Sequence, residues 1–377
     1  MTTPIPATTA TVTTADAATP LRFAMIGAGV MARYHLPALA EQPGVGSVVA
    51  LCDAREEAVK AGAELAPAAR GFSTLDELLA EVEIDAAIIG TPHYLHFPQA
   101  LELVRRGIHV LIEKPVTCTT TELRQLAAQS QKTGAFVLPG QTRRFVREMR
   151  WARAHIDADP GLIGEVTTFA IQSLQDLRAY PGGPGHWFFD GKLAGGGVVI
   201  SLAVHQLDLL RYLTGQDFTQ VAAAALYDPP FVNDAESSMS AMLQLDNGAA
   251  GTMQASYTAA RAPFSESLNI IGRNGTLAQH AEKIGDSRGP LMIASSHGAA
   301  PTDWADQYSG WAQITPARGL EDWGANAFAN MQAHFVDVIR GHVDAEVSLE
   351  RNFNTIACIE ALMRSAREQR PVEVEKW

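Results

Sequence analysis

The chain has 377 residues, of which 47% are hydrophobic, so it is long enough to bury a full core and longer than one typical domain. Its 29 basic and 41 acidic residues give a formal net charge of -12, which disfavours nonspecific binding to nucleic acid or to an anionic membrane. We therefore expect two domains and a small-molecule ligand.

The N-terminus and the cysteines bear on the compartment. Residues 1–20 are rich in Thr and Ala and lack a basic start followed by a long apolar stretch, which predicts a flexible tail and not a signal peptide. No segment reads as long and apolar enough to span a bilayer. Cys52, Cys118 and Cys358 are widely spaced and one is necessarily unpaired, which fits a reducing compartment and offers no zinc spacing. We expect a cytoplasmic protein without a membrane span or a metal site.

Short apolar runs alternate with helical patterns over residues 21–140. The expected strands are Phe23–Gly27, Val48–Cys52, Ala86–Gly90, Val110–Glu113 and Ala135–Pro139. This alternation predicts an α/β domain with a doubly wound parallel sheet of the Rossmann type.

The first strand runs into a glycine turn, Gly27-Ala-Gly-Val-Met-Ala32, and a helical segment that ends near Ala40. Gly27 permits a tight turn and Gly29 lets the backbone approach a pyrophosphate, while Ala32 lets the helix pack closely on the strand. The turn predicts a dinucleotide site that includes Val30 and Met31.

Asp53 ends the second strand about 20 residues after Ala32, the offset expected for the carboxylate that binds an adenosine ribose. A carboxylate at this place would repel a ribose phosphate, so it favours NAD over NADP. The neighbouring Arg55 leaves the phosphate contact open.

The pattern changes after residue 140. A helical stretch over 143–156 precedes strand-like segments at 165–173 and 220–227. Ser238–Leu245 and Ala249–Tyr257 flank Asn247-Gly248, a strong hairpin signal. These features predict an α+β substrate-binding domain over residues 141–325 with a large open mixed or antiparallel sheet.

The end of the chain has two kinds of segment. Residues 285–324 show no clear period and are predicted to form a loop. Asn326–Arg340 and Leu349–Arg367 return to helical spacing, so residues 326–377 are expected to form helices that pack back toward the first domain.

Four motifs, in this order, carry a family resemblance. They are Gly27-Ala-Gly-Val-Met-Ala32, Thr91-Pro-His-Tyr-Leu-His96, Glu113-Lys-Pro115 and Gly195-Gly-Gly-Val-Val-Ile-Ser-Leu-Ala-Val-His-Gln-Leu-Asp208. From about Leu21 onward the chain resembles the glucose-fructose oxidoreductase, inositol dehydrogenase and rhizopine catabolism family (Gfo/Idh/MocA). The resemblance implies NAD or NADP at the switch point of a Rossmann domain, an open mixed sheet after it, and sugars, cyclitols or related diols as substrates.

The resemblance also implies residue roles. It assigns Glu113 to the nicotinamide-side ribose and Lys114 to the substrate hydroxyl, with a cis peptide between Lys114 and Pro115 that aims the lysine into the cleft. The remaining implied cofactor contacts are Thr91, Pro92, His93, His96 and Gln141.

Hydride transfer from a carbinol carbon also requires a base within reach of the hydroxyl proton. Lys114 and His205 are the candidates, since burial and a cationic nicotinamide would lower the pKa of a lysine and a histidine titrates near neutral pH. We hypothesise that His205 exchanges the proton and Lys114 polarises the oxygen, with reversed or shared roles still open. Asp208 shares a helix face with His205, and we interpret it as substrate-binding rather than as a solvated aspartate.

Ser201 stands four residues before His205, where the resemblance leads us to expect an aspartate. Serine cannot act as an ionised base, so either the proton relay depends on Lys114 and His205 or the substrate presents a different group there. We include Ser201 among the substrate-binding candidates.

Arg143 and Arg144 open the second domain and are candidates for binding an acidic sugar substituent, because guanidinium forms bidentate pairs with such groups. The arginines that follow at helical spacings are interpreted as a solvated face. Trp187 stacks on a sugar or covers the nicotinamide, unless it is ordinary packing. His35 is interpreted as structural.

The leading hypothesis is an NAD-dependent oxidoreductase acting on a secondary hydroxyl of a sugar, cyclitol or glycoside. The alternative is an NAD-dependent, redox-neutral glycoside hydrolase that works by transient oxidation, elimination and hydride return, including on an acidic sugar glycoside. A noncatalytic NAD sensor is disfavoured because it would not need Lys114, His205 and Asp208. An open sheet of this family usually buries a face, so we expect a homodimer or homotetramer.

Overall fold

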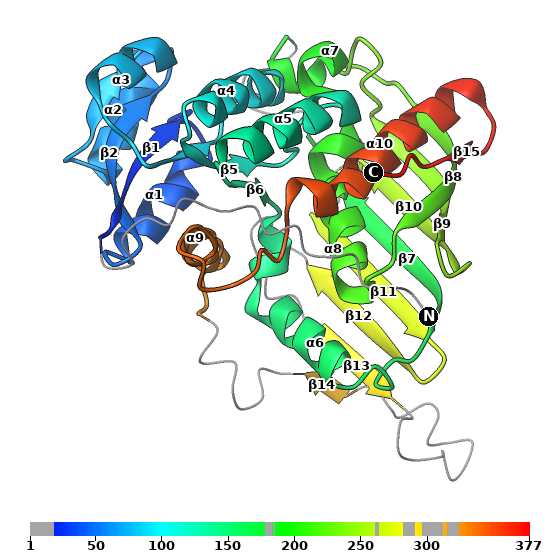
Figure 1. Cartoon of the computed structure of the whole chain (residues 1–377). Coiled ribbons are helices and arrows are strands. Elements are labelled where there is room, and N and C mark those ends of the chain that lie inside the picture. The colour runs from blue at the N-terminus through cyan, green and yellow to red at the C-terminus, as the bar shows by residue number, and fades with distance from the viewer. Residues whose placement is uncertain are drawn as a thin grey trace.

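This computed structural model describes residues 19–177, 183, 185–260, 264–281, 291–295, 312–314 and 324–377. The chain forms two sheets with helices packed on them and between them (Figure 1). Residues 1–18 of the predicted N-terminal tail lie outside the described part of the chain.

The first sheet has six strands in the order β3-β2-β1-β4-β5-β6, and all neighbouring pairs are parallel. The strands are β1 (Leu21–Ile26), β2 (Gly46–Cys52), β3 (Arg70–Phe72), β4 (Ala86–Ile89), β5 (His109–Glu113) and β6 (Val137–Gly140). The helices are α1 (Ala32–Ala40), α2 (Glu56–Leu65), α3 (Leu75–Glu81), α4 (His93–Arg105) and α5 (Thr120–Thr133). Every residue of β4 and β5 is buried, as expected for strands with both faces covered. The predicted doubly wound sheet is confirmed.

The strand order reverses between β1 and β4, which are neighbours in the sheet although two strands separate them in sequence. The loops that leave the carboxyl ends of such strands diverge and leave a crevice. The loop after β1 begins at Gly27, and the loop after β4 runs from Gly90 to Pro92. The fold therefore places the predicted dinucleotide turn at the switch point.

The second sheet has nine strands in the order β14-β13-β12-β11-β7-β10-β9-β8-β15. They are β7 (Val166–Leu174), β8 (Phe218–Leu226), β9 (Ser238–Leu245), β10 (Ala250–Ser256), β11 (Ser265–Gly272), β12 (Gly275–Ala281), β13 (Leu291–Ser295), β14 (Ala312–Ile314) and β15 (Val372–Glu373). β10 pairs in parallel with β7, and the other described pairs are antiparallel. The predicted mixed sheet and its Asn247-Gly248 hairpin are confirmed.

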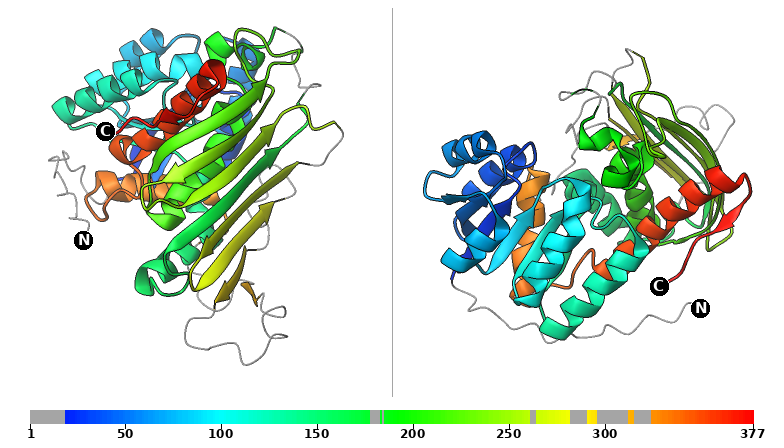
Figure 2. Two further views of the ribbon diagram at one scale, coloured as in Figure 1. Left: turned by 90° about the vertical axis from the view of Figure 1, so that its right-hand side faces the viewer. Right: turned by 90° about the horizontal axis from the view of Figure 1, so that it is seen from above.

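The helices that follow β6 are η1 (Thr142–Phe145), α6 (Arg147–Ala158), η2 (Trp187–Phe189), α7 (Gly191–Ala194), the π-helical segment η3 (Val199–Ala203), α8 (Val204–Thr214), α9 (Ala327–Ile339) and α10 (Leu349–Glu368). They lie on one face of this second sheet, except that α9 packs on the first domain. Figure 2 shows the opposite face of the sheet with no described helix across it. Burial along β9 alternates residue by residue, which fits a sheet covered on one side.

The prediction of a loop over 285–324 is wrong where the structure describes it. Leu291–Ser295 and Ala312–Ile314 are the edge strands β13 and β14. Such short strands carry too few residues for a period-2 pattern to stand out. Apart from Gly324, the rest of that range lies outside the described residues.

The two C-terminal helices contact different partners. On α9, Phe335 packs against Phe23 and Phe136 of the first domain, with ring centroids 6.2 and 5.9 Å apart. Helix α10 packs on both β8 and α5, and its Glu360 accepts hydrogen bonds from the amide and the hydroxyl of Thr120. The last helix thereby joins the second sheet to the first domain.

One helical run in the described residues is long and apolar enough to cross a membrane, namely Gly191–Thr214, which joins α7, η3 and α8. The sequence analysis expected no segment that is long and apolar enough to span a membrane, and by length and composition that expectation was wrong. Most of the run is buried inside the protein, as for a core helix.

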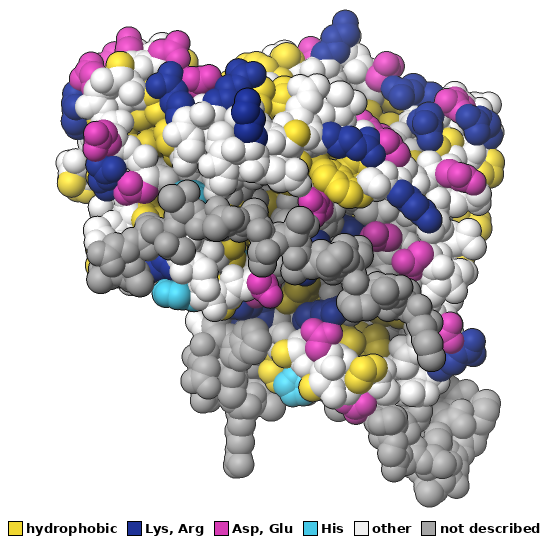
Figure 3. Space-filling model, viewed as in Figure 1, with side chains coloured by type: hydrophobic (Ala, Val, Ile, Leu, Met, Phe, Trp, Pro, Cys, Tyr) yellow, Lys and Arg dark blue, Asp and Glu magenta, His cyan; other side chains and the backbone are white. Residues whose placement is uncertain are grey.

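Charges of both signs are mixed over the surface seen in Figure 3. Among the described residues on this face, lysine and arginine side chains are interspersed with aspartate and glutamate, and neither sign forms one continuous patch. That face therefore offers no extended basic surface.

Candidate active site

The glycine turn after β1 is shaped by close backbone contacts. Gly27 has a φ of +90°, and a Cβ there would lie 2.8 Å from the carbonyl carbon and oxygen of Gly90. A Cβ at Gly29 would meet the Nη2 atom of Arg55 at 3.3 Å. Helix α1 begins at Ala32, and its N-terminal end carries partial positive charge. The residues present fit a pyrophosphate held by backbone amides.

Val30 and Met31 complete this turn in different environments. The Val30 side chain is exposed, whereas Met31 lies against Gly90, where a Cβ would come within 2.9 Å of the Met31 Cβ. The assignment of both residues to the cofactor stays a prediction.

Asp53 follows β2 at the same edge of the sheet. Its carboxylate accepts hydrogen bonds from the amide of Ala28 and from the backbone and side chain of Arg55, at 3.0 to 3.2 Å. Because Asp53 already neutralises the Arg55 guanidinium, the arginine does not present a free cation to a ribose phosphate. The geometry favours NAD, as the sequence did.

Two histidines of α4 brace the cleft. Both ring nitrogens of His96 lie 2.7 to 2.8 Å from backbone carbonyl oxygens, those of Pro115 and Thr91. The Nδ1 of His93 lies 2.8 Å from the carbonyl oxygen of Ala194 in the second domain. The buried His96 ring thereby helps to position the two loops, and its contact with the cofactor stays a prediction.

The other predicted residues near these loops are placed as follows. The Thr91 hydroxyl donates to Gln99, and Pro92 precedes the first turn of α4. Gln141 is buried, and its Nε2 has no hydrogen-bond partner in the described residues. The Trp187 ring packs edge-on against His93, with centroids 4.8 Å apart. The ligand contacts of Thr91, Pro92, His93, Gln141 and Trp187 stay predictions.

Glu113 is held by a residue that sequence reasoning set aside. His35, fully buried on α1, donates from Nε2 to the Glu113 carboxylate at 2.9 Å, and Gln332 of α9 donates to His35 Nδ1 and to its carbonyl. The other Glu113 oxygen accepts from the Lys114 amide at 3.3 Å. Both Glu113 oxygens are thus engaged by protein groups, one by His35 and the other by the Lys114 amide. The contact of Glu113 with the ribose stays a prediction.

Lys114 extends from β5 toward the second domain. The Lys114–Pro115 peptide is cis, as predicted, and the Lys114 ammonium donates to the backbone carbonyl of Ser201 at 2.7 Å. Burial lowers the pKa of Lys114, and the Arg143 charge lowers it further, whereas Glu113 and Glu266 oppose the change. The lysine is therefore easier to deprotonate than an exposed one.

The segment that carries Ser201 and His205 begins at a close approach of two backbones. A Cβ at Gly197 would come within 1.9 Å of the Glu236 carbonyl oxygen, so only glycine fits. The buried Glu236 carboxylate accepts from the amides of Gly197 and Val199, both at 2.8 Å. Burial raises the pKa of Glu236 to about 7, although the hydrogen bonds from these amides act to lower it. Glu236 thereby fixes the start of η3.

Ser201 and His205 follow on η3 and the first turn of α8. The buried Ser201 Oγ and His205 Nδ1 have no hydrogen-bond partner among the described residues. Burial, together with the charges of Lys114 and Arg143, holds the pKa of His205 well below its usual range. His205 is therefore neutral at physiological pH.

Arg143 meets a carboxylate from the far sheet. One oxygen of the fully buried Glu266, on β11, accepts from Arg143 Nη2. Arg143 Nε and the second Glu266 oxygen lack partners in the described part of the chain. Lys114, Ser201, His205, Arg143 and Glu266 form one cluster, which we call the polar cluster.

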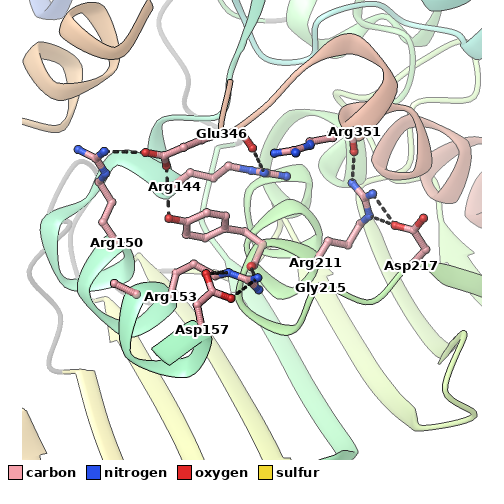
Figure 4. A pocket seen from close by; sticks show the side chains of 11 residues that line it. Arg144, Arg150, Arg153, Asp157, Arg211, Gly215, Asp217, Glu346 and Arg351 are labelled. Carbon is pink, nitrogen blue, oxygen red and sulfur yellow. Dashed lines mark hydrogen bonds and ion pairs between the residues drawn. The ribbon is translucent and has the colours of Figure 1, made fainter. Parts of the chain in front are cut away.

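Arg144 and Asp208 bind each other beside that cluster. The Arg144 guanidinium donates to both Asp208 oxygens, at 2.6 and 2.8 Å. It also donates to the Glu346 carbonyl at 3.0 Å (Figure 4). Asn352 and Thr355 of α10 also donate to Asp208. Each of the two residues is buried and bound to the other, which indicates a structural role, and their contact with substrate stays a prediction.

The arginines after Arg144 are not a fully solvated face. Arg150 pairs with Glu346, and Arg153 pairs with Asp157 while donating to the Tyr212 carbonyl. These residues line a pocket of about 490 Å³ beside α6 and α8 (Figure 4). Their partners tie α6 to the segment before α10.

Comparison with known proteins agrees with this geometry. Residues 21–141 match the family model described as oxidoreductase family, NAD-binding Rossmann fold, of Gfo/Idh/MocA, and residues 149–278 match the Gfo/Idh/MocA C-terminal domain. The chain belongs to the Gfo/Idh/MocA family. It is thus an NAD-binding oxidoreductase of that family.

Individual members of the Gfo/Idh/MocA family align over different lengths. The rhizopine catabolism protein MocA of Rhizobium meliloti is 30% identical over 55% of this chain and 61% of its own length, so the match spans less than two thirds of that relative. Inositol 2-dehydrogenase of Rhizobium meliloti (strain 1021) is 25% identical over 94% of this chain and 99% of its own. Levoglucosan dehydrogenase in complex with NADH shares the fold, with a TM-score of 0.83 and 22% identity over 95% of this chain and 100% of its own.

Replacing Gly27 with Ala is expected to weaken NADH binding by at least about tenfold, roughly 1.4 kcal/mol. Alanine is strained at a φ of +90°, and its Cβ would overlap Gly90, so the turn must move. Fluorescence titration with NADH measures the effect. Gly44→Ala is the control, since a Cβ there meets nothing within 4 Å. Unchanged affinity in Gly27→Ala would exclude this turn as the cofactor site.

Sequence reasoning missed Glu236 and Glu266 and treated His35 as merely structural. Glu266 did leave a signal, since it is a charged residue at an inward position of the alternating strand Ser265–Gly272. Nothing in the local sequence of His35 or Glu236 indicates the partner, because each partner is distant in the chain.

Proposed function

We propose that this family member oxidises a secondary hydroxyl of a neutral sugar or cyclitol with NAD, or reduces the corresponding ketone. The proposal depends on one observation. Four buried polar atoms around Lys114 have no partner in the described residues, namely Ser201 Oγ, His205 Nδ1, Arg143 Nε and one Glu266 oxygen. Buried polar groups are nearly always satisfied, so a group of exceptions indicates a ligand rich in hydroxyls.

The polar cluster suggests how the proton moves. When bound, NAD supplies the hydride acceptor for the carbinol carbon. Lys114, with its lowered pKa, takes the hydroxyl proton at Nζ, and Glu113 with His35 holds the lysine in place. Neutral His205 orients the hydroxyl through Nδ1. These roles reverse our first hypothesis, because a proton on His205 would sit beside two cations.

The charges favour a neutral substrate over an acidic one. Arg144 is neutralised by Asp208, and Arg143 by Glu266. Neither guanidinium therefore carries an uncompensated charge that would favour a carboxylate on the substrate. The names of the relatives, inositol 2-dehydrogenase and levoglucosan dehydrogenase, also support a neutral polyol.

The test is to incubate the purified protein with NAD or NADP and a panel of neutral sugars, cyclitols and glycosides. NADH absorbance and sugar products are measured in the same tubes. We expect NADH in proportion to ketone product, with NAD preferred over NADP because of Asp53. Glycoside cleavage without NADH accumulation would instead support the redox-neutral hydrolase, and an absence of turnover would support a binding protein.

The assembly remains a prediction of the family resemblance, and the location remains a prediction from the sequence. A homodimer or homotetramer would cover the face of the second sheet that carries no described helix, where Met242 is 62% exposed. Light scattering after size-exclusion chromatography measures the assembly. A cytoplasmic location is proposed from the cysteine pattern alone.

A further inference from the structure

Glu266 occupies an unusual position for a carboxylate. It lies on β11 directly opposite Ser173 of β7, on the face of the sheet where Leu268 and Ile270 are fully buried. The Glu266 side chain has no exposed surface. A buried charge is strongly destabilising unless it is paired and hydrogen-bonded, so this position needs a reason.

The pairing of Glu266 is only half complete. Arg143 binds one carboxylate oxygen, and the other has no partner in the described residues. The hydroxyl of Ser173, its cross-strand neighbour, is also buried without a described partner. Gln279 of β12, diagonal to Glu266 on the same face, has an unpartnered buried Oε1 as well. Three adjacent strands thus present unsatisfied polar atoms on one side.

The unpartnered atoms of Ser173 and Gln279 continue the polar cluster along the second sheet, beyond Glu266. Lys114 experiences the charges of both Glu266 and Arg143, so the Glu266–Arg143 pair lies beside the reacting centre and not on a remote surface. A carboxylate only accepts hydrogen bonds, and a substrate hydroxyl is the donor that its free oxygen lacks. A carboxylate on the substrate would meet a like charge there.

We propose that Glu266 determines substrate specificity by accepting a hydrogen bond from a hydroxyl next to the one that reacts, while Arg143 holds it in place. The pair selects neutral polyols and rejects acidic sugars. At position 201 the chain has a serine where the family resemblance led us to expect an aspartate, so the segment before α8 contributes no carboxylate to the cluster. Glu266 contributes a carboxylate from the second sheet. This inference rests on the proposed oxidoreductase function and names the substrate class for it.

The test compares Glu266→Gln with the wild type on D-glucose, D-xylose and myo-inositol, on the monodeoxy analogues of the best of these, and on D-glucuronate. In the wild type, one monodeoxy analogue is expected to lose at least about tenfold in kcat/KM, the value of one charged hydrogen bond. In Glu266→Gln, the loss in kcat/KM caused by the missing hydroxyl is expected to be severalfold smaller than in the wild type. The ratio of kcat/KM for D-glucuronate to that for D-glucose rises at least about tenfold, because Arg143 is no longer neutralised.

Glu165→Gln is the matched control, because it makes the same change in an exposed pair with Arg273 on the second domain. Melting temperature and NADH titration verify that both variants are folded. A uniform loss in Glu266→Gln on parent, deoxy and acidic sugars would show that Glu266 is only structural and overturn the inference. If the wild type turns over none of the three neutral substrates, the result contradicts the proposed function itself, independently of the role of Glu266.

Discussion

Replacing Lys114 with Met is expected to lower kcat for alcohol oxidation by about 10²- to 10⁴-fold, the range of general acid–base catalysis. Methionine keeps the bulk of the side chain but removes both the proton-exchanging nitrogen and the bond to the Ser201 carbonyl. NADH affinity should stay close to that of the wild type, because the glycine turn and Asp53 are unchanged. Stopped-flow absorbance and NADH titration measure the two quantities separately.

Lys60→Met makes the same substitution at an exposed lysine and should leave kcat unchanged. A nearly normal rate in Lys114→Met would refute the assignment of Lys114. A rate loss of the same size in His205→Gln, with the pH dependence retained in Lys114→Met, would instead move the proton exchange to His205.

The pH profile follows from the groups around Lys114. Burial and Arg143 lower its pKa, Glu113 and Glu266 raise it, and His205 beside it stays neutral. Oxidation needs the neutral amine, so kcat/KM should rise with pH and level off below the ordinary lysine pKa of about 10.4, while ketone reduction falls. Lys114→Met should flatten both profiles.

Replacing Asp208 with Asn is expected to lower the free energy of unfolding by about 3–5 kcal/mol, since it leaves the buried Arg144 without its charge partner. Arg144 also donates to the Glu346 carbonyl and stacks over Tyr212, so the guanidinium cannot turn away from Asp208 without breaking these contacts. Denaturation in urea measures the change.

Asp157→Asn is the control for this prediction. It breaks an exposed pair with Arg153 near the same pocket and should change the free energy of unfolding by less than about 1 kcal/mol. If Asp208→Asn is no more destabilising than Asp157→Asn, Asp208 is not a structural residue and its interpretation as a ligand would have to be reconsidered.

The Arg144–Asp208 pair also bears on the polar cluster. Arg144 follows Arg143 directly in η1, and Asp208 lies one turn after His205 in α8. The pair therefore fixes the distance between the two elements that present Arg143 and His205. Two residues that sequence reasoning assigned to substrate thus connect the elements that carry the polar cluster.

Local patterns were enough to predict the first domain and the hairpin of the second. Buried strands such as β4 and β5 are continuous apolar runs, and Gly27 and Asn247-Gly248 mark turns through their own backbone preferences. The cis Lys114–Pro115 peptide was likewise indicated by a motif of adjacent residues. These features depend on neighbours in the chain, so the sequence alone determined them.

Contacts between distant residues were decided only by the tertiary structure. Arg143 and Glu266 are 123 residues apart, His35 and Glu113 are 78 apart, and Arg144 and Asp208 are 64 apart. Periodicity shows that a residue faces inward, but it does not show which side chain the residue will contact there. The packing of α8, η1 and β11 decided which arginine braces the fold and which faces the polar cluster.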